Sequence, residues 1–558
     1  MKQLKLFRVF YCLLAIVCSA MTAAAIEKDT DGYYLIGSTA DFEEFCDLVN
    51  TGNPFASARV TADGINVTRS IGSGERMFYY RGKFDGQGHT LTVTEQSDNG
   101  IFAHTEAGCE IRNVNVTGTS YLSAIVYEAR GTTLENCHSD ATINGRYYIT
   151  PGGLIALSRG PVTLINCSFS GEIHAAETGG GLIGHIDHTA YISDCQVTGQ
   201  FDIAANIDES SNFVENTYVN GELVTRSVDA PSGEGDDIIK HLGVKYQIKQ
   251  DNGNETLTLL ACNSSIKAIK IPNTITRNGK EYPVTIIGDN SMSYRKLEYL
   301  MVPSNVTRIG NNAFHYSESL RDVVFLDSDT KLWLGEDDDF TPDQDLFYAC
   351  PVERVYIGRN LAWNGGWYHD APFDTHSSIR EIDFGPRVTV VGNVDEPNCH
   401  NSELFNECEK VESYAFLGDE KSLGTSIKFH CAEGMSHAST AYISRDLEPS
   451  NYTEYTTLAS GYAISDKTEH ATYGPFATYV TPKMYSGSDV LDNSYLYEVD
   501  LTNATRLTTI GERAFADCDQ MRKIDMFNTN VKNIDKEAFY DCDNLHNVTF
   551  STTLENVG

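Results

Sequence analysis

Positive charge is scarce in this sequence. Its 558 residues carry 42 lysines and arginines against 77 aspartates and glutamates, a formal net charge of −35. A surface of this sign repels nucleic acid and anionic lipid, because both carry negative phosphate groups. The composition therefore argues against a nucleic-acid partner and suits an extracellular protein.

Long apolar runs are also missing, apart from one at the N-terminus. There, basic residues precede the apolar stretch 10–17, and small residues follow it up to Ala25. This layout predicts a signal peptide over residues 1–25 with cleavage near Ala25, since the stretch is too short for a membrane helix. Lipidation of Cys18 is the alternative, disfavoured by the bulky residue before it. We expect a secreted or outer-surface protein without a transmembrane helix.

Signatures of catalysis and cofactor binding are absent as well. No Ser-His-Asp signature, zinc-ligand spacing or phosphate-binding loop occurs in the sequence. The run 179–184 fits the pattern of a dinucleotide-binding loop, but a strand follows it where that loop needs a helix. The acidic run 336–339 offers oxygens to calcium, yet it lacks the spaced ligands of a calcium loop. We predict no enzyme, no cofactor and no metal.

An internal repeat occupies residues 100–223. Each unit has a short apolar piece behind a small residue, as at 153–156 and 181–184, and then an alternating strand, as at 164–171 and 192–199. The units recur at intervals of about 20–30 residues, which is typical of one coil of a β-solenoid. Alternation places one strand face inside and the other outside. The pattern predicts a parallel β-helix-like solenoid.

The Gly-Leu-Ile-Gly pieces of this array resemble GLUG motifs. Upstream, the stretch 84–91 resembles the opening coil of right-handed parallel β-helices that carry such motifs. The resemblance implies a GLUG-type β-helix-like domain over residues 26–226. Residues 38–49 predict a capping helix, because Ser38 or Thr39 can cap it and its apolar residues share one face. Such a helix would protect the unpaired edge of the first coil.

Three cysteines, Cys137, Cys167 and Cys195, take the same place in successive units. Stacked coils lie about 4.8 Å apart, a distance that also permits a disulfide. Small buried thiols would instead pack as compact apolar groups. We favour a ladder of buried free thiols.

A different repeat fills the C-terminal half of the chain. Its unit is Ile-Gly-x-x-Ala-Phe-x-x-Cys followed by a leucine and a short strand, as at 510–518 and 534–542. One coil cannot bury its own apolar face, so neighbouring coils must stack. We expect the Ala-Phe pair to fill the core opposite the strand, whose inward residues would be Leu545, Val548 and Phe550 in the last unit.

This unit resembles the BspA-like leucine-rich repeat family of surface proteins from Bacteroides-type bacteria. Composition and resemblance together divide the C-terminal part of the chain into a linker at 227–240, a β lead-in at 241–286 and leucine-rich repeats at 287–558, irregular at 327–345 and 418–500. Two degenerate copies stand at 346–350 and 404–408. The sequence stops within a further unit, so we expect the chain to be truncated at its C-terminus.

The family resemblance implies adhesion to host proteins or to other cells, and leucine-rich repeats bind through their strand face. We therefore predict an extracellular binding protein with a protein partner. The candidate binding face consists of the outward strand positions Tyr299, Met301, Asp322, Val324, Arg354, Tyr356, Glu381, Asp383, Lys523, Asp525, Asn547 and Thr549.

The alternative is a carbohydrate-active enzyme or glycan-binding protein built on the first array. Its nearest candidate residues are Asp85, His89, His185, Asp187 and His188. Glycoside hydrolysis needs a pair of carboxyl groups for acid and base. The sequence places no second carboxylate beside these residues, so we favour solvated strands and turns.

Overall fold

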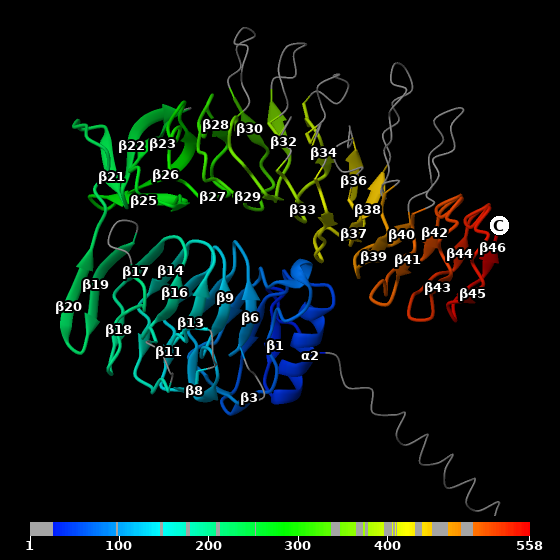
Figure 1. Cartoon of the computed structure of the whole chain (residues 1–558), viewed down its shortest axis with the longest axis horizontal. Helices are drawn as coiled ribbons and strands as arrows, with labels where there is room; N and C mark the ends of the chain where they lie inside the picture. Colours follow the sequence, from blue (N-terminus) through cyan, green and yellow to red (C-terminus); the bar gives the residue numbers. More distant parts are fainter. Residues whose placement is uncertain are drawn as a thin grey trace, which may run out of the picture.

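Strand pairing in the computed structural model is almost entirely parallel, and the chain forms two stacked β-solenoids (Figure 1). The predicted fold class, a mostly β protein with a β-helix-like solenoid before a leucine-rich repeat solenoid, is confirmed. The predicted signal peptide, Cys18 and the acidic run 336–339 lie outside the described residues. The structure describes residues 26–95, 99–145, 149–174, 179–207, 212–251, 253–335, 346–363, 372–373, 378–395, 404–405, 408, 410–429, 438–448, 467–480 and 495–558.

The first array runs from residue 34 to residue 226 and has three parallel strands in most coils. One ladder contains β1 (Tyr34–Ile36), β2 (Ala58–Val60), β4 (Lys83–Asp85), β7 (Glu110–Arg112), β10 (Thr133–Glu135), β14 (Val162–Ile165) and β17 (Ala190–Ser193). The next contains β3 (Ile65–Val67), β5 (Thr90–Val93), β8 (Asn115–Ser120) with β12 (Thr142–Ile143) beside it, β11 (His138–Ser139), β15 (Ser168–Phe169) and β18 (Gln196–Val197). The Gly-Leu-Ile pieces lead into a separate sheet of β6 (Phe102–Thr105), β9 (Val126–Ala129), β13 (Ile155–Ser158) and β16 (Ile183–Ile186).

Both ends of the first array are covered. Helix α2 (Thr39–Asn50) caps the N-terminal end, and the Ser38 hydroxyl accepts a hydrogen bond from the backbone N–H of Asp41 at 3.2 Å. Its four apolar residues are buried, which confirms the predicted capping helix: Phe42, Phe45, Cys46 and Val49. At the other end, β20 (Glu222–Arg226) pairs antiparallel with β19 (Phe213–Val219) and ends the parallel stacking.

The stacked cysteines of the first array are buried free thiols, as predicted. The backbone N–H of Cys167 donates to the Sγ atom of Cys195 at 3.3 Å, so the Cys195 thiol contacts the backbone of the preceding coil. A second ladder stands beside them, which the sequence reasoning missed. Asn136 donates to Asn113 at 3.1 Å, and Asn166 donates to Asn136 at 2.7 Å.

These three asparagines adopt left-handed backbone conformations, with φ between 49° and 54°. Asparagine tolerates that conformation better than most residues do. Asn113, Asn136 and Asn166 therefore turn the chain and join neighbouring coils.

The two arrays are joined by a loop and an antiparallel meander. The predicted linker at 227–240 is shorter than expected, because residues 238–241 already form β21 (Ile238–His241) against β22 (Val244–Asp251). Strands β22 and β23 (Asn254–Cys262) form a hairpin, and Gly253 supplies its positive φ of 84°. A second hairpin, β25 (Thr274–Arg277) and β26 (Lys280–Ile287), then leads into the repeats.

The second array carries one sheet of eleven strands along its whole length. The strands are β24 (Ala268–Lys270), β27 (Tyr299–Val302), β29 (Asp322–Phe325), β31 (Arg354–Ile357), β33 (Glu381–Phe384), β35 (Ser413–Phe416), β37 (Thr440–Ile443), β39 (His470–Tyr473), β41 (Glu498–Asp500), β43 (Lys523–Asp525) and β45 (Asn547–Thr549). The region 418–500, expected to break the period, does not interrupt this sheet, because β37, β39 and β41 pair in register within it.

Shorter strands form the opposite side of the second array. They are β28 (Arg308–Ile309), β30 (Leu332–Leu334), β32 (Leu361–Trp363), β34 (Val390–Val391), β36 (Ser426–Phe429), β38 (Asp446–Glu448), β40 (Tyr479–Val480), β42 (Thr509–Ile510), β44 (Asn533–Ile534) and β46 (Asn556–Val557).

Between the two sides lies a ladder of phenylalanines. The rings of Phe314, Phe347, Phe373 and Phe405 stack at centroid distances of 5.3, 4.9 and 5.4 Å. This confirms the register of the degenerate copies at 346–350 and 404–408.

Phe550 lies in the inward column predicted for it, because the pairing of β43 with β45 aligns it with Met526 of the preceding coil. Its side chain is 49% exposed, whereas Met526, at the same place in the preceding coil, is fully buried. The backbone N–H of Met526 donates to the carbonyl of Thr549, so the last coil covers Met526. No described coil lies beyond Phe550 to cover it in turn.

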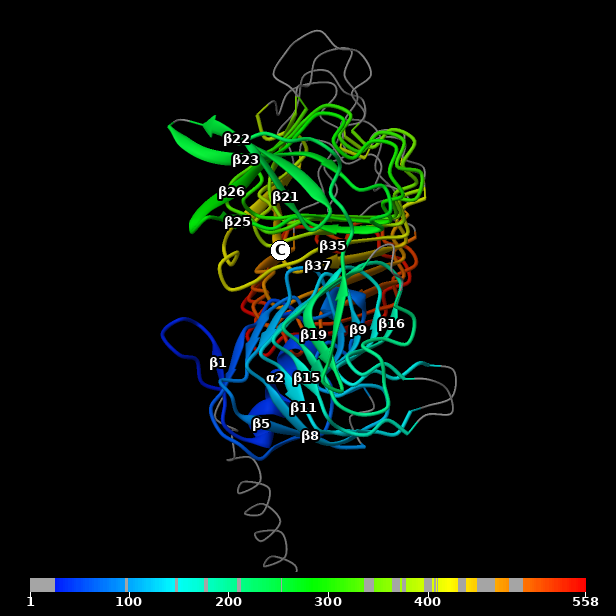
Figure 2. The same ribbon diagram turned by 90° about the vertical axis from the view of Figure 1, so that its left-hand side faces the viewer.

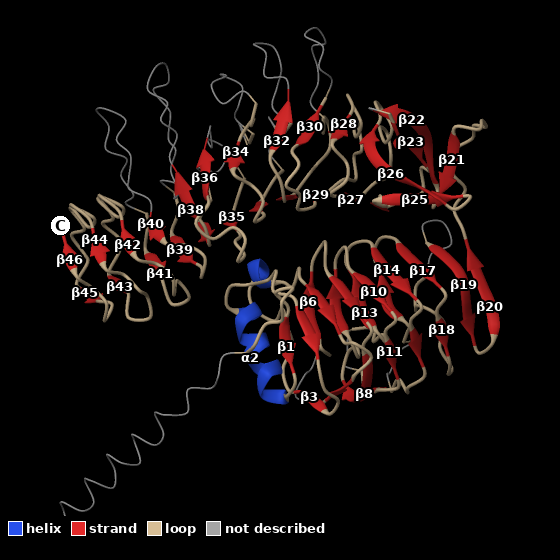
Figure 3. Cartoon of the chain, turned by 180° about the vertical axis from the view of Figure 1, so that it is seen from behind, coloured by secondary structure: helices blue, strands red, loops and turns tan. Residues whose placement is uncertain are grey.

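The arrays lie side by side and run in opposite directions (Figures 1 and 3). The chain leaves the first array at β20, reverses through the meander, and returns along the first array toward α2. Figure 2 shows the second array above the first when viewed along their length. None of the described helices is long and apolar enough to cross a membrane.

Candidate functional site

The twelve predicted binding residues lie in two columns on the eleven-stranded sheet. Pairing aligns Tyr299 with Asp322, Arg354 and Glu381 in one column, and Met301 with Val324, Tyr356 and Asp383 in the other. Lys523 and Asn547 belong to the first column, and Asp525 and Thr549 to the second. The residues between the columns, such as Leu300 and Val323, are fully buried in the repeat core. All twelve positions therefore point away from that core, as the alternation predicts.

Eight of the twelve do not form an open surface, because the first array covers them. Tyr299, Met301 and Tyr356 are 1%, 4% and 5% exposed. The expectation of one continuous accessible face is thus wrong for the strands from β27 to β33. Alternation along a strand determines which side a residue faces, whereas it carries no information about a second domain docked on that side.

An apolar cluster spans the contact between the arrays. Met77 and Phe78 of the first array pack with Tyr356, Ala415 and other residues of the strand face. The ring of Phe78 meets that of Tyr442 edge-on at 5.4 Å. Burial of such side chains stabilises the contact by about 25 cal/mol per Å² of apolar surface.

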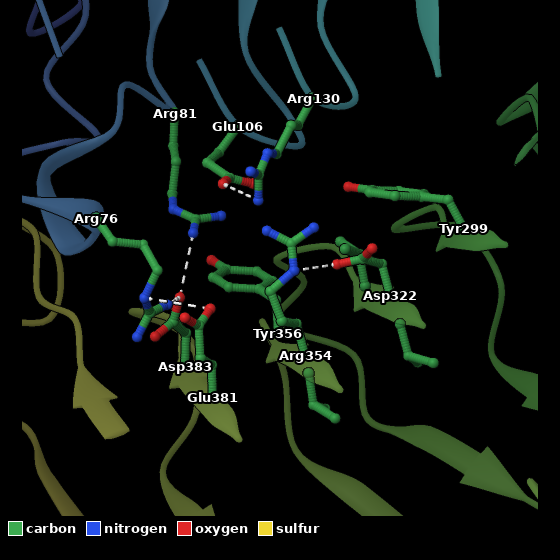
Figure 4. Close-up of a pocket in the computed structure, with 13 residues that line it drawn as sticks. Arg76, Arg81, Glu106, Arg130, Tyr299, Asp322, Arg354, Tyr356, Glu381 and Asp383 are labelled. Carbon is green, nitrogen blue, oxygen red and sulfur yellow. Dashed lines mark hydrogen bonds and ion pairs between the residues drawn. The ribbon is translucent and has the colours of Figure 1, made fainter. Parts of the chain in front are cut away.

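Charged side chains from both arrays lie around Tyr356 at this contact (Figure 4). The Nη1 atom of Arg76 lies 2.7 Å from Asp383 Oδ2, and Arg81 Nη2 lies 3.3 Å from the same oxygen. Arg76 also approaches Glu381, with Nε 3.4 Å from Oε2. The guanidinium of Arg81 sits over the ring of Tyr356, 4.4 Å from its centroid. Two arginines of the first array therefore hold the centre of the strand face.

Burial at this contact perturbs the carboxyl groups. It raises the pKa of Asp322 to about 8, although Arg130 opposes the shift and Arg354 Nε lies 2.5 Å from Asp322 Oδ1. It raises the pKa of Asp327 to about 6, against a hydrogen bond of 2.9 Å from the Tyr356 hydroxyl. The removal of water, not the nearby positive charge, dominates both shifts.

The charged residues enclose a cavity of only about 30 Å³. This is room for one or two water molecules, far below the several hundred Å³ of ligand pockets. The cluster is therefore suited to hold two solenoids together and unsuited to bind an organic substrate.

Polar contacts extend along both sides of this centre. Near the meander, the ammonium of Lys270 donates to the hydroxyls of Thr133 and Thr163 at 2.7 and 2.8 Å. At the far end, Lys28 Nζ lies 3.6 Å from Glu420 Oε1. The contact thus extends from β24 to the neighbourhood of α2. Residues early in one array contact residues late in the other.

The end of the strand face beyond this contact is accessible. The four predicted residues on β43 and β45 are all exposed: Lys523, Asp525, Asn547 and Thr549. A large apolar side chain, Phe527, follows β43 and is 58% exposed. Tyr497, just before β41, is 50% exposed and lies under the guanidinium of Arg522. We call β41, β43 and β45 with Phe527 and Tyr497 the open strand face.

The candidate residues of the first array do not converge on one site. Asp85 binds Arg112, with the atoms Oδ2 and Nε at 3.2 Å, and His89 lies 3.3 Å from Asp63. His185 Nε2 and Asp187 Oδ1 are 3.0 Å apart. The third histidine, His188, faces Glu298 of the second array at 3.5 Å, within the contact between the arrays.

The pair of His185 and Asp187 has a structural partner, because Arg159 Nη1 lies 2.6 Å from Asp187 Oδ2. Within the described ranges, no three His, Cys, Asp or Glu side chains are grouped so as to hold a metal ion. The candidate residues of the first array therefore take part in separate ion pairs, and His188 belongs to the contact between the arrays.

Sequence reasoning missed several residues of the two columns. The irregular coils contribute Ser413, Ala415, Thr440, Tyr442, His470, Thr472, Glu498 and Asp500. Insertions between their strands hide the repeat period. Short apolar strands before an aromatic residue, as at 413–416, were the available signal.

Comparison with known proteins identifies the second array. Residues 261–362, 285–427 and 487–558 match the model of the BspA type leucine rich repeat region, in six copies. The second array is therefore a BspA-type leucine-rich repeat region. The match does not extend to the first array, so its similarity to GLUG-motif proteins stays a prediction. No curated protein matches the chain.

Several solved structures are similar over part of the chain. A leucine-rich repeat protein from Bacteroides ovatus is 18% identical and covers 59% of this chain and 91% of its own, with a TM-score of 0.21. A leucine rich cell surface protein from Faecalibacterium prausnitzii is 15% identical, with coverages of 58% and 96% and a TM-score of 0.19. The pneumococcal vaccine antigen PcpA is 12% identical, with coverages of 57% and 71% and a TM-score of 0.17. TM-scores this low support no inference about overall arrangement.

Proposed function

We propose that this chain, with its BspA-type leucine-rich repeats, is a secreted or cell-surface binding protein that holds a protein partner on the open strand face. The predicted signal peptide supports the location, since it would deliver both arrays outside the cell. No catalytic role is proposed.

One observation carries the choice of site: the first array covers the strand face as far as β37, where Phe78 meets Tyr442, and the outward residues of β43 and β45 are exposed. Leucine-rich repeats bind through that face. While the two arrays stay docked, a partner can therefore reach the strand face at β41, β43 and β45.

The open strand face has the residue types of an interaction site. Phe527 and Tyr497 are each about half exposed, and exposed large apolar side chains that lie together mark interfaces. Aromatic residues dominate binding energy at interfaces, with polar residues around them. Because the chain is strongly acidic, a basic patch on the partner would speed association, and added salt would slow it.

The test compares the intact protein with a double variant of the open strand face, Lys523→Glu with Phe527→Ser. Surface-immobilised extracellular-matrix proteins and intact bacterial cells serve as binding targets. The double variant should lose affinity about tenfold or more, the loss expected when an aromatic anchor is removed. Tyr540→Ala is the matched control, because Tyr540 is 50% exposed but lies on a turn outside the strand face.

Equal binding by the wild type and the double variant would reject this site. Absence of binding to all targets, together with cleavage of a polysaccharide by the intact chain, would favour the enzyme alternative instead. A thermal unfolding curve of each variant shows that its repeats are folded.

A further inference from the structure

Four aromatic side chains gather on the outer turns of three successive repeats, away from both the strand face and the contact between the arrays. The ring of Tyr294 stacks on that of Tyr316 at 4.9 Å, with 13° between the planes. Tyr348 meets Tyr316 edge-on at 5.3 Å, and His315 lies 4.8 Å from Tyr348. We call Tyr294, His315, Tyr316 and Tyr348 the aromatic platform.

The platform is open to solvent. Tyr294 is 67% exposed, the most exposed large apolar side chain among the described residues, and Tyr348 is 48% exposed. Only one face of the Tyr294 ring is used by the stack on Tyr316. These rings therefore contribute little to the core, which is filled at the same turns by Phe314 and Phe347.

The backbone makes tyrosine an unexpected choice at two of these positions. Tyr294 and Tyr316 both have φ of 55°, in the left-handed region. Bulky residues rarely adopt that conformation, whereas aspartate and asparagine tolerate it. In the C-terminal repeats, the same turn position carries Asp517 and Asp541, with φ of 60° and 55°.

Backbone hydrogen bonds show that these turns are equivalent. The N–H of Tyr316 donates to the carbonyl of Tyr348 at 2.9 Å, and the N–H of Asp517 donates to that of Tyr540 at 2.8 Å. The repeat thus folds with aspartate at this position. Strained residues that the fold does not require concentrate at functional sites.

We propose that the aromatic platform binds a neutral oligosaccharide, with a pyranose ring stacked on the free face of Tyr294. The electron-rich face of an aromatic ring attracts partially positive hydrogens, and one face of a pyranose presents a set of such C–H groups. The tyrosine hydroxyls and the imidazole of His315 supply hydrogen bonds for sugar hydroxyls around the stacked ring.

The electrostatics of the platform favour an uncharged ligand. The neighbouring Tyr348 raises the pKa of Tyr316 most, followed by desolvation and Tyr294. The strongly negative chain would repel an anionic sugar.

The size of the platform favours a sugar over a protein. A stable protein interface covers about 800 Å² on each partner, whereas four side chains provide a small fraction of that area. A single sugar ring matches one tyrosine ring in size. The platform would therefore act beside the open strand face, and it does not depend on the function proposed for that face.

The experiment is native affinity electrophoresis of the intact protein in gels that contain a soluble β-glucan, xyloglucan or galactomannan, with polygalacturonate as the anionic comparison. At least one neutral polysaccharide should retard the wild type, and polygalacturonate should not. Tyr294→Asp and Tyr348→Ala should each weaken binding about three- to tenfold, the scale of one well-packed ring contact.

Tyr294→Asp also separates binding from folding. It installs the residue that later repeats carry at this turn, so its thermal stability should equal or exceed that of the wild type. Tyr540→Ala is the matched control, because Tyr540 occupies the same turn position as Tyr348 but lies alone under the guanidinium of Arg513, 4.6 Å from its centroid. This variant should migrate like the wild type in every gel.

Three outcomes would overturn the inference: no retardation by any neutral polysaccharide, retardation by polygalacturonate alone, or equal retardation of wild type and Tyr294→Asp. Loss of binding to a protein target in Tyr294→Asp, without any glycan effect, would also overturn it. Failure of the open strand face to bind a protein leaves these gel measurements unchanged, so the two proposals fail separately.

Discussion

Replacing Asp383 with alanine should separate the two arrays without unfolding either. Asp383 Oδ2 pairs with Arg76 at 2.7 Å and with Arg81 at 3.3 Å, and the aspartate and Arg81 are 4% and 7% exposed. Removing one partner of a buried ion pair costs about 3–5 kcal/mol, because the other charge stays buried without compensation.

The lower end of that range applies here. Arg76 keeps Glu381 at 3.4 Å, and Arg81 keeps the ring of Tyr356 at 4.4 Å. A loss of about 3 kcal/mol shifts the balance between docked and separated arrays by roughly a hundredfold, at about 1.4 kcal/mol per factor of ten. Each array has its own apolar core, so the solenoids should stay folded.

A thiol placed under the contact measures the separation. Val324 is 6% exposed beneath the first array, so the cysteine of Val324→Cys can react with a thiol reagent only when the arrays part. Asp383→Ala should raise its reaction rate in proportion to the separated population, by up to about a hundredfold. Asp525→Ala is the matched control, because Asp525 lies in the same column but is exposed beyond the contact.

The reasoning would be refuted if the thiol of Val324→Cys reacted no faster in the Asp383→Ala variant than in the protein that carries Val324→Cys alone. It would also be refuted if circular dichroism showed that Asp383→Ala unfolds the second array, since the aspartate would then support the repeats rather than the docking. Stronger partner binding by Asp383→Ala would show that the covered residues can bind once exposed.

Two further predictions concern pH and the repeat core. Burial raises the pKa of Asp322 to about 8 and that of Asp327 to about 6. In separated arrays we expect both carboxyl groups to return to an ordinary pKa of about 4, so the docked form binds more protons than the separated form. Docking should therefore weaken as the pH rises from about 5 to about 8. The reaction rate of Val324→Cys, corrected for thiolate fraction, should therefore increase over this range, and a rate that falls would contradict it. Phe515→Ala should destabilise the C-terminal repeats by about 3–5 kcal/mol, and Phe539→Ala by less, because Phe515 is fully buried and Phe539 only partly so. Denaturant unfolding of both variants measures this, and equal losses would contradict the assigned burial.

Local and periodic features could be read from the sequence. The capping helix followed from Ser38 and one apolar face, and the thiol ladder followed from the equal placing of Cys137, Cys167 and Cys195. The outward columns of the second array followed from alternation around residues such as Leu300 and Val323. Each signal repeats or lies within a few residues, so a single chain displays it.

Features that depend on neighbouring coils were harder to predict. Phe550 has the sequence position of a core residue, but its burial requires a further coil against it. The strands β37 and β39 continue the sheet, although insertions conceal their period. In both cases, the surroundings of a strand matter more than the pattern within it.

The sequence by itself determined two solenoids, the register of their regular coils and the direction in which the strand residues of those coils point, because one coil buries its apolar face only against a similar coil. The tertiary structure decided which part of the strand face is accessible. That decision depends on contacts such as Arg76 with Asp383, whose partners are 307 residues apart. Such a pair belongs to no repeat and leaves no periodic signal, so only the docked arrays reveal that the first solenoid covers the binding face predicted for the second.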